Sequence, residues 1–70
     1  MNPYKLFVKF EMPSKLGRVK ATDSYLIWAD SAQIAVETML YQLPEDAEHV
    51  RITQIWKDTG KRWERVEMDV

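Results

Sequence analysis

The chain has 70 residues, with ten Lys and Arg, eleven Asp and Glu and one His, and its formal net charge is −1. A chain this short forms one domain, residues 1–70, and buries only about 60% of the surface that its unfolded form exposes, so we expect modest stability. The absence of cysteine excludes a disulfide framework and thiolate chemistry, and a single histidine argues against a histidine-based zinc site.

We expect no export signal in the N-terminal residues. Residues 1–4 lack the basic region and the apolar run of a signal peptide, and no stretch approaches the roughly 18 apolar residues of a membrane span. We therefore expect a cytoplasmic protein that makes no membrane contact.

Charge is distributed unevenly along the chain. Residues 21–50 hold six acids and no lysine or arginine, whereas the remaining residues hold all ten bases and five acids. Because complementary charge steers association, the acidic middle third favours encounter with a basic partner.

The first predicted element is a strand with one buried face. Every second residue from Tyr4 to Met12 is apolar. The residues between them are Lys5, Phe7, Lys9 and Glu11. This alternation is typical of a half-buried strand, and Phe7 is the exception because it falls on the lysine face. Residues 13–17 are predicted to form a loop.

A second strand is predicted within residues 18–29. Val19 and the odd-numbered apolar residues that follow it match the apolar face of the first strand. Leu26 and Trp28 have the opposite parity. Either a bulge near residues 22–24 switches the face, or both faces are partly covered.

A helix is predicted from the N-cap signal Asp30–Ser31 to about Leu43, where Pro44 ends it. Its apolar residues recur at helical spacing on one stripe: Ala32, Val36, Met39, Leu40 and Leu43. Ile34 and Tyr41 lie one above the other, away from that stripe. We expect both to be partly exposed, and they form a second candidate docking patch.

Residues 51–68 are predicted to form a β-hairpin with two unequal faces. Asp58 suits the start of a turn, and Gly60 enters the left-handed region without steric cost. A three-residue loop formed by residues 58–60 fits this turn and pairs Lys57 with Lys61.

The match of side chains across the hairpin selects its register. In the register set by the three-residue loop, apolar residues lie opposite one another: Ile55 and Trp63, Ile52 and Val66, Val50 and Met68. A slip by one residue sets Ile52 against Glu67 and moves every side chain to the other face, so we reject it. The core face is expected to carry Val50, Ile52, Val66 and Met68.

The order strand, strand, helix, strand, strand predicts an α+β fold, a four-stranded antiparallel sheet with one helix packed on one face (ββαββ order). One helix covers only one face of such a sheet, so the other, here named the outer face, is open to solvent or covered by another molecule. The residues predicted to form the binding surface there are Lys5, Phe7, Lys9, Arg51, Ile55, Lys57, Lys61, Trp63 and Arg65.

Cations interleaved with aromatic residues suit two classes of partner. Single-stranded nucleic acid would stack bases on Trp63 and Phe7, at about 1 to 3 kcal/mol each, while basic residues hold the phosphates. A protein would instead bury Trp63 and Arg65 as anchors. Two further interpretations stay open: a homodimer that buries Ile55 and Trp63 between two sheets, and a cross-strand pair that only stabilises the hairpin.

The sequence offers no catalytic or cofactor-binding constellation. A nucleophile beside a base, or paired carboxylates in a cleft, cannot be assembled, and both glycines fall in predicted turns rather than in a phosphate-binding loop. Glu45, Asp46, Glu48 and His49 are of metal-ligand types, but a charged loop after a helix is usually solvated. We expect a non-enzymatic binding protein without cofactor or metal.

The predicted helix, the run Val50–Ile52 and the segment Lys57–Trp63 together resemble a small phage anti-CRISPR family that blocks type I-F surveillance complexes. The resemblance covers roughly the C-terminal half of the chain. It implies an inhibitor that binds a host ribonucleoprotein complex in the host cytoplasm and obstructs target-DNA pairing. The contacts it implies are Lys57, Lys61, Arg62 and Trp63. A phage or mobile-element inhibitor is therefore the leading hypothesis, and a small nucleic-acid-binding module is the alternative.

Overall fold

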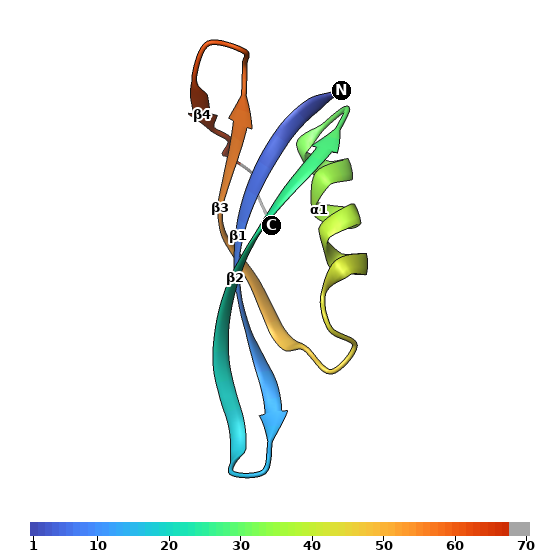
Figure 1. The fold of residues 1–70 in the computed structure, drawn as a ribbon, viewed down its shortest axis with the longest axis vertical. Helices are drawn as coiled ribbons and strands as arrows, with labels where there is room; N and C mark the ends of the chain where they lie inside the picture. Colours follow the sequence, from blue (N-terminus) through green and yellow to red (C-terminus); the bar gives the residue numbers. More distant parts are fainter. Residues whose placement is uncertain (68–70) are drawn as a thin grey trace.

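The fold is a four-stranded antiparallel sheet with one helix on one face, seen in a computed structural model that describes residues 1–67 (Figure 1). In chain order, the elements are β1 (Asn2–Ser14), β2 (Gly17–Ala29), α1 (Ala32–Gln42), β3 (Glu48–Asp58) and β4 (Trp63–Arg65). The strand order in the sheet is β2-β1-β3-β4. The α+β fold predicted from the sequence is confirmed.

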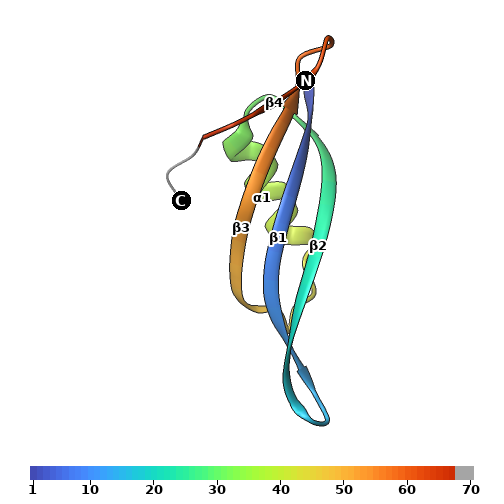
Figure 2. The same ribbon diagram turned by 90° about the vertical axis from the view of Figure 1, so that its left-hand side faces the viewer.

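β1 and β2 form one long hairpin. Every residue of β1 has a partner on β2, so the bulge considered near residues 22–24 does not occur in this pair. The two strands are joined by Lys15 and Leu16, after which Gly17 adopts φ 106°, in the left-handed region that glycine enters without steric cost. The turn end of this hairpin extends beyond the helix (Figures 1 and 2).

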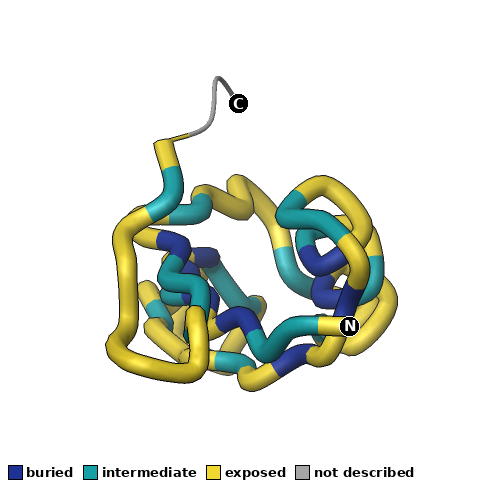
Figure 3. Tube along the Cα trace, turned by 90° about the horizontal axis from the view of Figure 1, so that it is seen from above, coloured by how far each residue is buried: buried dark blue, intermediate teal, exposed yellow. Residues whose placement is uncertain are grey.

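The core lies between α1 and the facing side of β1, β2 and β3. The buried residues are Tyr4, Leu6, Val8, Phe10, Ile27, Ala29, Ala35, Met39 and Ile55. They come from both the sheet and the helix, with exposed residues around them (Figure 3). The predicted alternation of β1 is confirmed, but Leu40, predicted on the buried helix stripe, is 49% exposed and Ala35 is buried in its place.

Ser31 caps α1 as predicted. Its Oγ accepts a hydrogen bond from the Ile34 N–H at 3.2 Å, and its carbonyl oxygen accepts one from the Ala35 N–H at 3.0 Å. The helix ends at Gln42, just before Pro44.

The substitution Ser31→Ala is expected to lower the free energy of unfolding by about 1 kcal/mol, because it leaves the Ile34 N–H without its side-chain acceptor. Urea denaturation followed by circular dichroism measures this loss. Ser31→Asp keeps an acceptor at the N-cap and should stay close to the parent chain. Equal losses for the two variants would show that the hydrogen bond is not the cause.

A β-bulge interrupts the pairing of β1 with β3. Phe7 lies opposite Gln54, but the next residue, Val8, lies opposite Ile52, so Thr53 is the extra residue on β3. The Thr53 Oγ1 donates to the Phe7 carbonyl oxygen at 3.2 Å, which gives that oxygen a partner at the point where the ladder is disturbed.

The bulge brings Ile52 and Ile55 to the same face of the sheet. Without an extra residue, positions three apart in a strand point to opposite faces. Here Ile55 lies opposite Leu6 and is 3% exposed, while Ile52 packs against the core from a partly buried position. The prediction that Ile55 lies on the outer face is therefore wrong, and so is a homodimer interface built on it.

The turn between β3 and β4 contains four residues rather than three. Thr59 donates to the Arg62 carbonyl oxygen from its N–H at 3.0 Å and from its Oγ1 at 3.1 Å. Gly60 has φ 91° and donates its N–H to the Asp58 Oδ1 at 2.8 Å. The predicted roles of Asp58 and Gly60 are confirmed, but the loop is longer than predicted.

The longer loop changes the register of the hairpin. Lys57 lies opposite Glu64 rather than Lys61. Lys57 also lies opposite Tyr4, which is buried beneath the helix, and directly opposite residues share a face. The prediction that Lys57 lies on the outer face is therefore wrong, and it is half-buried on the helix side.

The predicted core face of the hairpin is confirmed in part. Ile52 and Val66 pack against the core, and the Val66 N–H donates to the Ile55 carbonyl oxygen at 2.8 Å. Val50 is 37% exposed. The prediction for Met68 falls outside the described residues.

Candidate binding face

β1 presents three of the predicted site residues on the outer face. Lys5 and Lys9 are exposed and Phe7 is half-buried. The Lys5 Nζ lies 5.5 Å from the centroid of the Phe7 ring, which is cation–π geometry. In Figure 2 the helix lies behind the sheet, so this face is seen uncovered.

A row of side chains crosses all four strands at Lys5. Leu26 on β2 and Trp56 on β3 lie opposite Lys5, and Arg65 on β4 lies opposite Trp56. The Trp56 Nε1–H donates to the Gln54 Oε1 at 3.1 Å, a bond between two neighbours on the same face. The row thus alternates apolar and cationic side chains across the sheet.

Two more tryptophans lie on the outer face at the same end of the sheet. Trp28 lies opposite Pro3 and is 61% exposed, and Trp63 lies opposite Asp58 and is 43% exposed. Leu26, in the row described above, is 60% exposed. The four aromatic residues of this face, together with Leu26, are here named the aromatic cluster: Phe7, Leu26, Trp28, Trp56 and Trp63.

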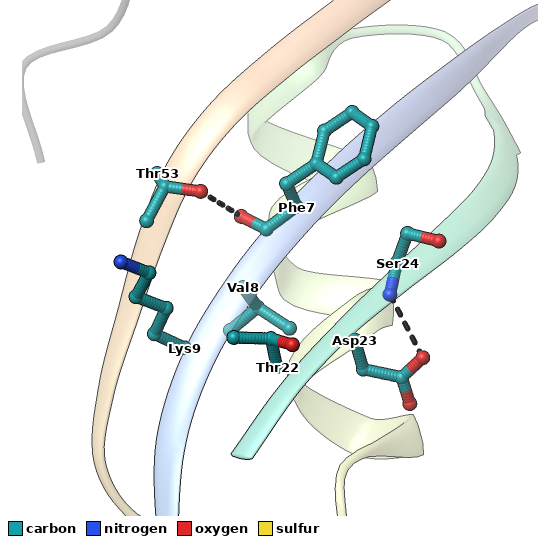
Figure 4. Close-up of a pocket in the computed structure, with 7 residues that line it drawn as sticks. All are labelled: Phe7, Val8, Lys9, Thr22, Asp23, Ser24 and Thr53. Carbon is teal, nitrogen blue, oxygen red and sulfur yellow. Dashed lines mark hydrogen bonds between the residues drawn. The ribbon is translucent and has the colours of Figure 1, made fainter. Parts of the chain in front are cut away.

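Lys9 and Arg51 are two cations that lie directly opposite one another on β1 and β3. Neither makes an ion pair with an acid among residues 1–67. Like charges in this position destabilise a sheet, so a bound anion would relieve the repulsion. The Lys9 side chain borders a shallow hollow of about 460 Å³ that Phe7, Thr22 and other residues also line (Figure 4).

Arg18, at the far end of the β1–β2 hairpin, is already paired with acids. It forms an ion pair with Glu48 and lies 3.9 Å from Glu11, and its Nη1 is 3.0 Å from the His49 Nδ1. His49 has φ 54°, a left-handed conformation that is uncommon for residues other than glycine. This cluster holds the start of β3 against β1 and β2, and its arginine offers less charge to a partner.

The structure brings six of the predicted binding residues together on the outer face. These are Lys5, Phe7, Lys9, Arg51, Trp63 and Arg65. Lys61 and Arg62 are exposed in the turn between β3 and β4, where the Arg62 Nε lies 3.3 Å from the Glu64 Oε1. Ile55 and Lys57 do not belong to this face.

Sequence reasoning missed three members of the aromatic cluster. Leu26 and Trp28 carried a signal, because their parity is opposite to that of the core residues of β2, and the uninterrupted pairing with β1 places them outside. Trp56 carried no such signal, because its facing depends on the bulge at Thr53.

The second candidate patch lies on the exposed side of α1. Ile34 is 45% exposed and Tyr41 is 91% exposed, which confirms the predicted partial exposure. Tyr41 lines a shallow hollow with Glu37 and Leu40. This surface is small and carries an acid.

Within residues 1–67, no three His, Asp or Glu side chains gather as metal ligands would. The one helix among these residues is too short and too polar to cross a membrane. Comparisons of this chain with family models, with curated proteins and with solved structures find no match.

Proposed function

We propose that this chain is a non-enzymatic binding protein and that the outer face of its sheet meets the partner. The observation that carries this proposal is the exposure of the aromatic cluster, in which Leu26, Trp28 and Trp63 are 60%, 61% and 43% exposed on a face that α1 leaves uncovered. Exposed apolar area with polar residues around it is typical of interaction surfaces.

The proposed partner is a host protein assembly. Tryptophan and arginine are the residue types most enriched among binding hot spots, and Trp63 and Arg65 lie on the same face of β4. The resemblance of the segment Lys57–Trp63 supports the most specific version, a phage inhibitor of a type I-F surveillance complex. Lys61 and Arg62, which the resemblance also implies as contacts, are exposed in the adjoining turn.

A second candidate function is the binding of single-stranded nucleic acid. Lys9 and Arg51 lie opposite one another without an acidic partner among residues 1–67, and Phe7 is beside them on β1. Phosphates would neutralise the two cations while bases stack on the exposed rings. Such binding weakens steeply and log-linearly as salt rises, whereas an apolar protein interface does not.

The test uses a type I-F surveillance complex assembled with its guide RNA. An equimolar amount of this chain is expected to prevent the complex from binding target DNA in a gel-shift assay. The same preparation is titrated with single-stranded DNA and RNA at low salt, with tryptophan fluorescence as the readout. Submicromolar binding of free nucleic acid, lost on addition of salt, would contradict the protein-binding proposal and favour the second candidate.

A further inference from the structure

The two edges of the sheet differ in their capacity to pair with another strand. β4 has three residues, and a short edge strand is one way in which proteins blunt a sheet edge. β2 has 13 residues without proline, and its pairing with β1 contains no bulge. In Figure 2 it forms one side of the sheet, and the helix lies behind the sheet rather than beside that strand. Within residues 1–67, β2 is therefore the long edge with the pairing capacity of a regular strand.

Hydrogen bonds around Phe7 show which main-chain groups of β2 point outward. The Phe7 carbonyl oxygen accepts a bond from Thr53 on β3, so the main-chain groups of Phe7 face β3. Opposite residues in an antiparallel pair exchange either both main-chain bonds or neither, so Phe7 and its partner Ser24 exchange neither. The N–H and C=O of Ser24 therefore point away from β1, as do those of the other even-numbered residues of β2.

The Ser24 amide has only a local acceptor. Its N–H donates to the Oδ1 of the preceding residue, Asp23, at 2.8 Å. Figure 4 shows this bond on the side of β2 that faces away from β1. A neighbouring strand would supply a main-chain carbonyl oxygen for the same N–H and release the Asp23 carboxylate.

The sequence of β2 is complementary to itself when reversed about Ser24. An antiparallel pair centred there sets Asp23 opposite Tyr25 of the second copy and Lys20 opposite Trp28 of the second copy. Within one copy, burial and the neighbouring Asp23 carboxylate raise the pKa of the Tyr25 hydroxyl. In the pair, the protonated Tyr25 hydroxyl is also a donor for the Asp23 carboxylate of the second copy. Lysine opposite tryptophan is a cation–π pair.

Other registers are less favourable. Centring the pair on Asp23 sets two carboxylates against one another, and like charges directly opposite are destabilising. Centring it on Tyr25 sets Asp23 against Ile27 of the second copy, a charge against a core residue. Slips that bring even positions against odd ones place the two helices on opposite sides of the joined sheet.

We propose that two copies of this chain associate through β2, antiparallel and centred on Ser24, so that their sheets join into one continuous sheet. The association is isologous, since each copy gives the other the same strand. Both helices then lie on one side, and the two aromatic clusters lie on the other. A chain of this size, with limited capacity to bury surface on its own, gains from such pairing. The inference does not rest on the proposed function, although the two share Trp28, which lies on β2 and belongs to the aromatic cluster. The anchors tested for partner binding, Trp63 and Arg65, are on β4.

The test exploits the absence of cysteine from the sequence. Ser24→Cys places a thiol on the two-fold axis, with Cα atoms about 5.5 Å apart, within the range of a disulfide. Thr22→Cys is the matched control, also exposed on the outer face, but its two Cα atoms are offset by four residues, about 13 Å along the strand. Under mild oxidation, Ser24→Cys is expected to form a covalent dimer at least roughly tenfold faster than Thr22→Cys.

Either of two results from the cysteine variants and the parent chain would overturn the proposal. One is equal or faster cross-linking of Thr22→Cys. The other is a parent chain that sediments as a monomer at millimolar concentration. Thr22→Pro removes an edge N–H that β1 does not use, so it should shift the dimer toward monomer while circular dichroism stays native. A Thr22→Pro variant that folds and dimerises like the parent would also count against β2 pairing.

Discussion

Leu6→Ala is expected to lower the free energy of unfolding by about 2–5 kcal/mol, the largest stability loss of any change considered for this chain. Leu6 is fully buried at the middle of β1, opposite Tyr25 on β2 and Ile55 on β3. Truncation removes the transfer free energy of the side chain and leaves a cavity that close-packed neighbours fill only in part.

The size of this loss matters because the chain is short. Stability of roughly 0.05–0.15 kcal/mol per residue corresponds to about 4–10 kcal/mol for the whole domain. Leu6→Ala is therefore expected to leave a large unfolded population at 37 °C. Urea denaturation monitored by tryptophan fluorescence measures the change.

Leu16→Ala is the matched control, since it makes the same substitution at the turn between β1 and β2. Leu16 is 99% exposed, so the expected change is within about 0.5 kcal/mol. If Leu6→Ala were as mild as Leu16→Ala, the core described above would not be the source of stability.

The double substitution Trp63→Ala with Arg65→Ala is expected to weaken partner binding at least roughly 100-fold without unfolding the chain. Hot-spot residues contribute about 2 kcal/mol or more each, and about 1.4 kcal/mol corresponds to a factor of ten in affinity. Both side chains lie on the outer face of β4 and are exposed, so their removal should change stability little. The readout is whether the variant still prevents the surveillance complex from binding target DNA.

Tyr41→Ala supplies the control for the double variant. Tyr41 is 91% exposed on α1, and its loss removes an aromatic side chain of similar size from the helix side of the molecule. We expect inhibition to be unchanged. Loss of inhibition in Tyr41→Ala together with full inhibition by the double variant would place the binding surface on the second candidate patch, formed by Ile34 and Tyr41, rather than on the outer face.

Much of the fold follows from local patterns in the sequence. The alternation from Tyr4 to Met12 predicts a strand with one buried face, because side chains alternate along a strand. Ser31 predicts the helix start, because its hydroxyl can satisfy an amide of the first turn. Asp58 and Gly60 predict the turn position through their own backbone preferences. Each of these signals acts within a few residues of chain.

The composition of the binding face was predicted only in part. Lys5, Phe7 and Lys9 lie on the outer face because the parity of β1 alone decides their direction. The sequence alone allows either facing for Trp28, and the uninterrupted register between β1 and β2 places it on the outer face. The sequence does not predict Trp56 on the binding face, whereas the structure places it opposite Lys5 on that face.

The sequence by itself determined the order of elements, the start of the helix and the buried side of β1, since periodicity and capping are properties of short segments. Only the tertiary structure decided that Thr53 bulges, that Ile55 turns inward and that Trp56 turns outward. The physical reason is that the bulge depends on how β3 pairs with β1, and the residues of these two strands lie far apart in the chain. One extra residue then reverses the facing of every side chain beyond it.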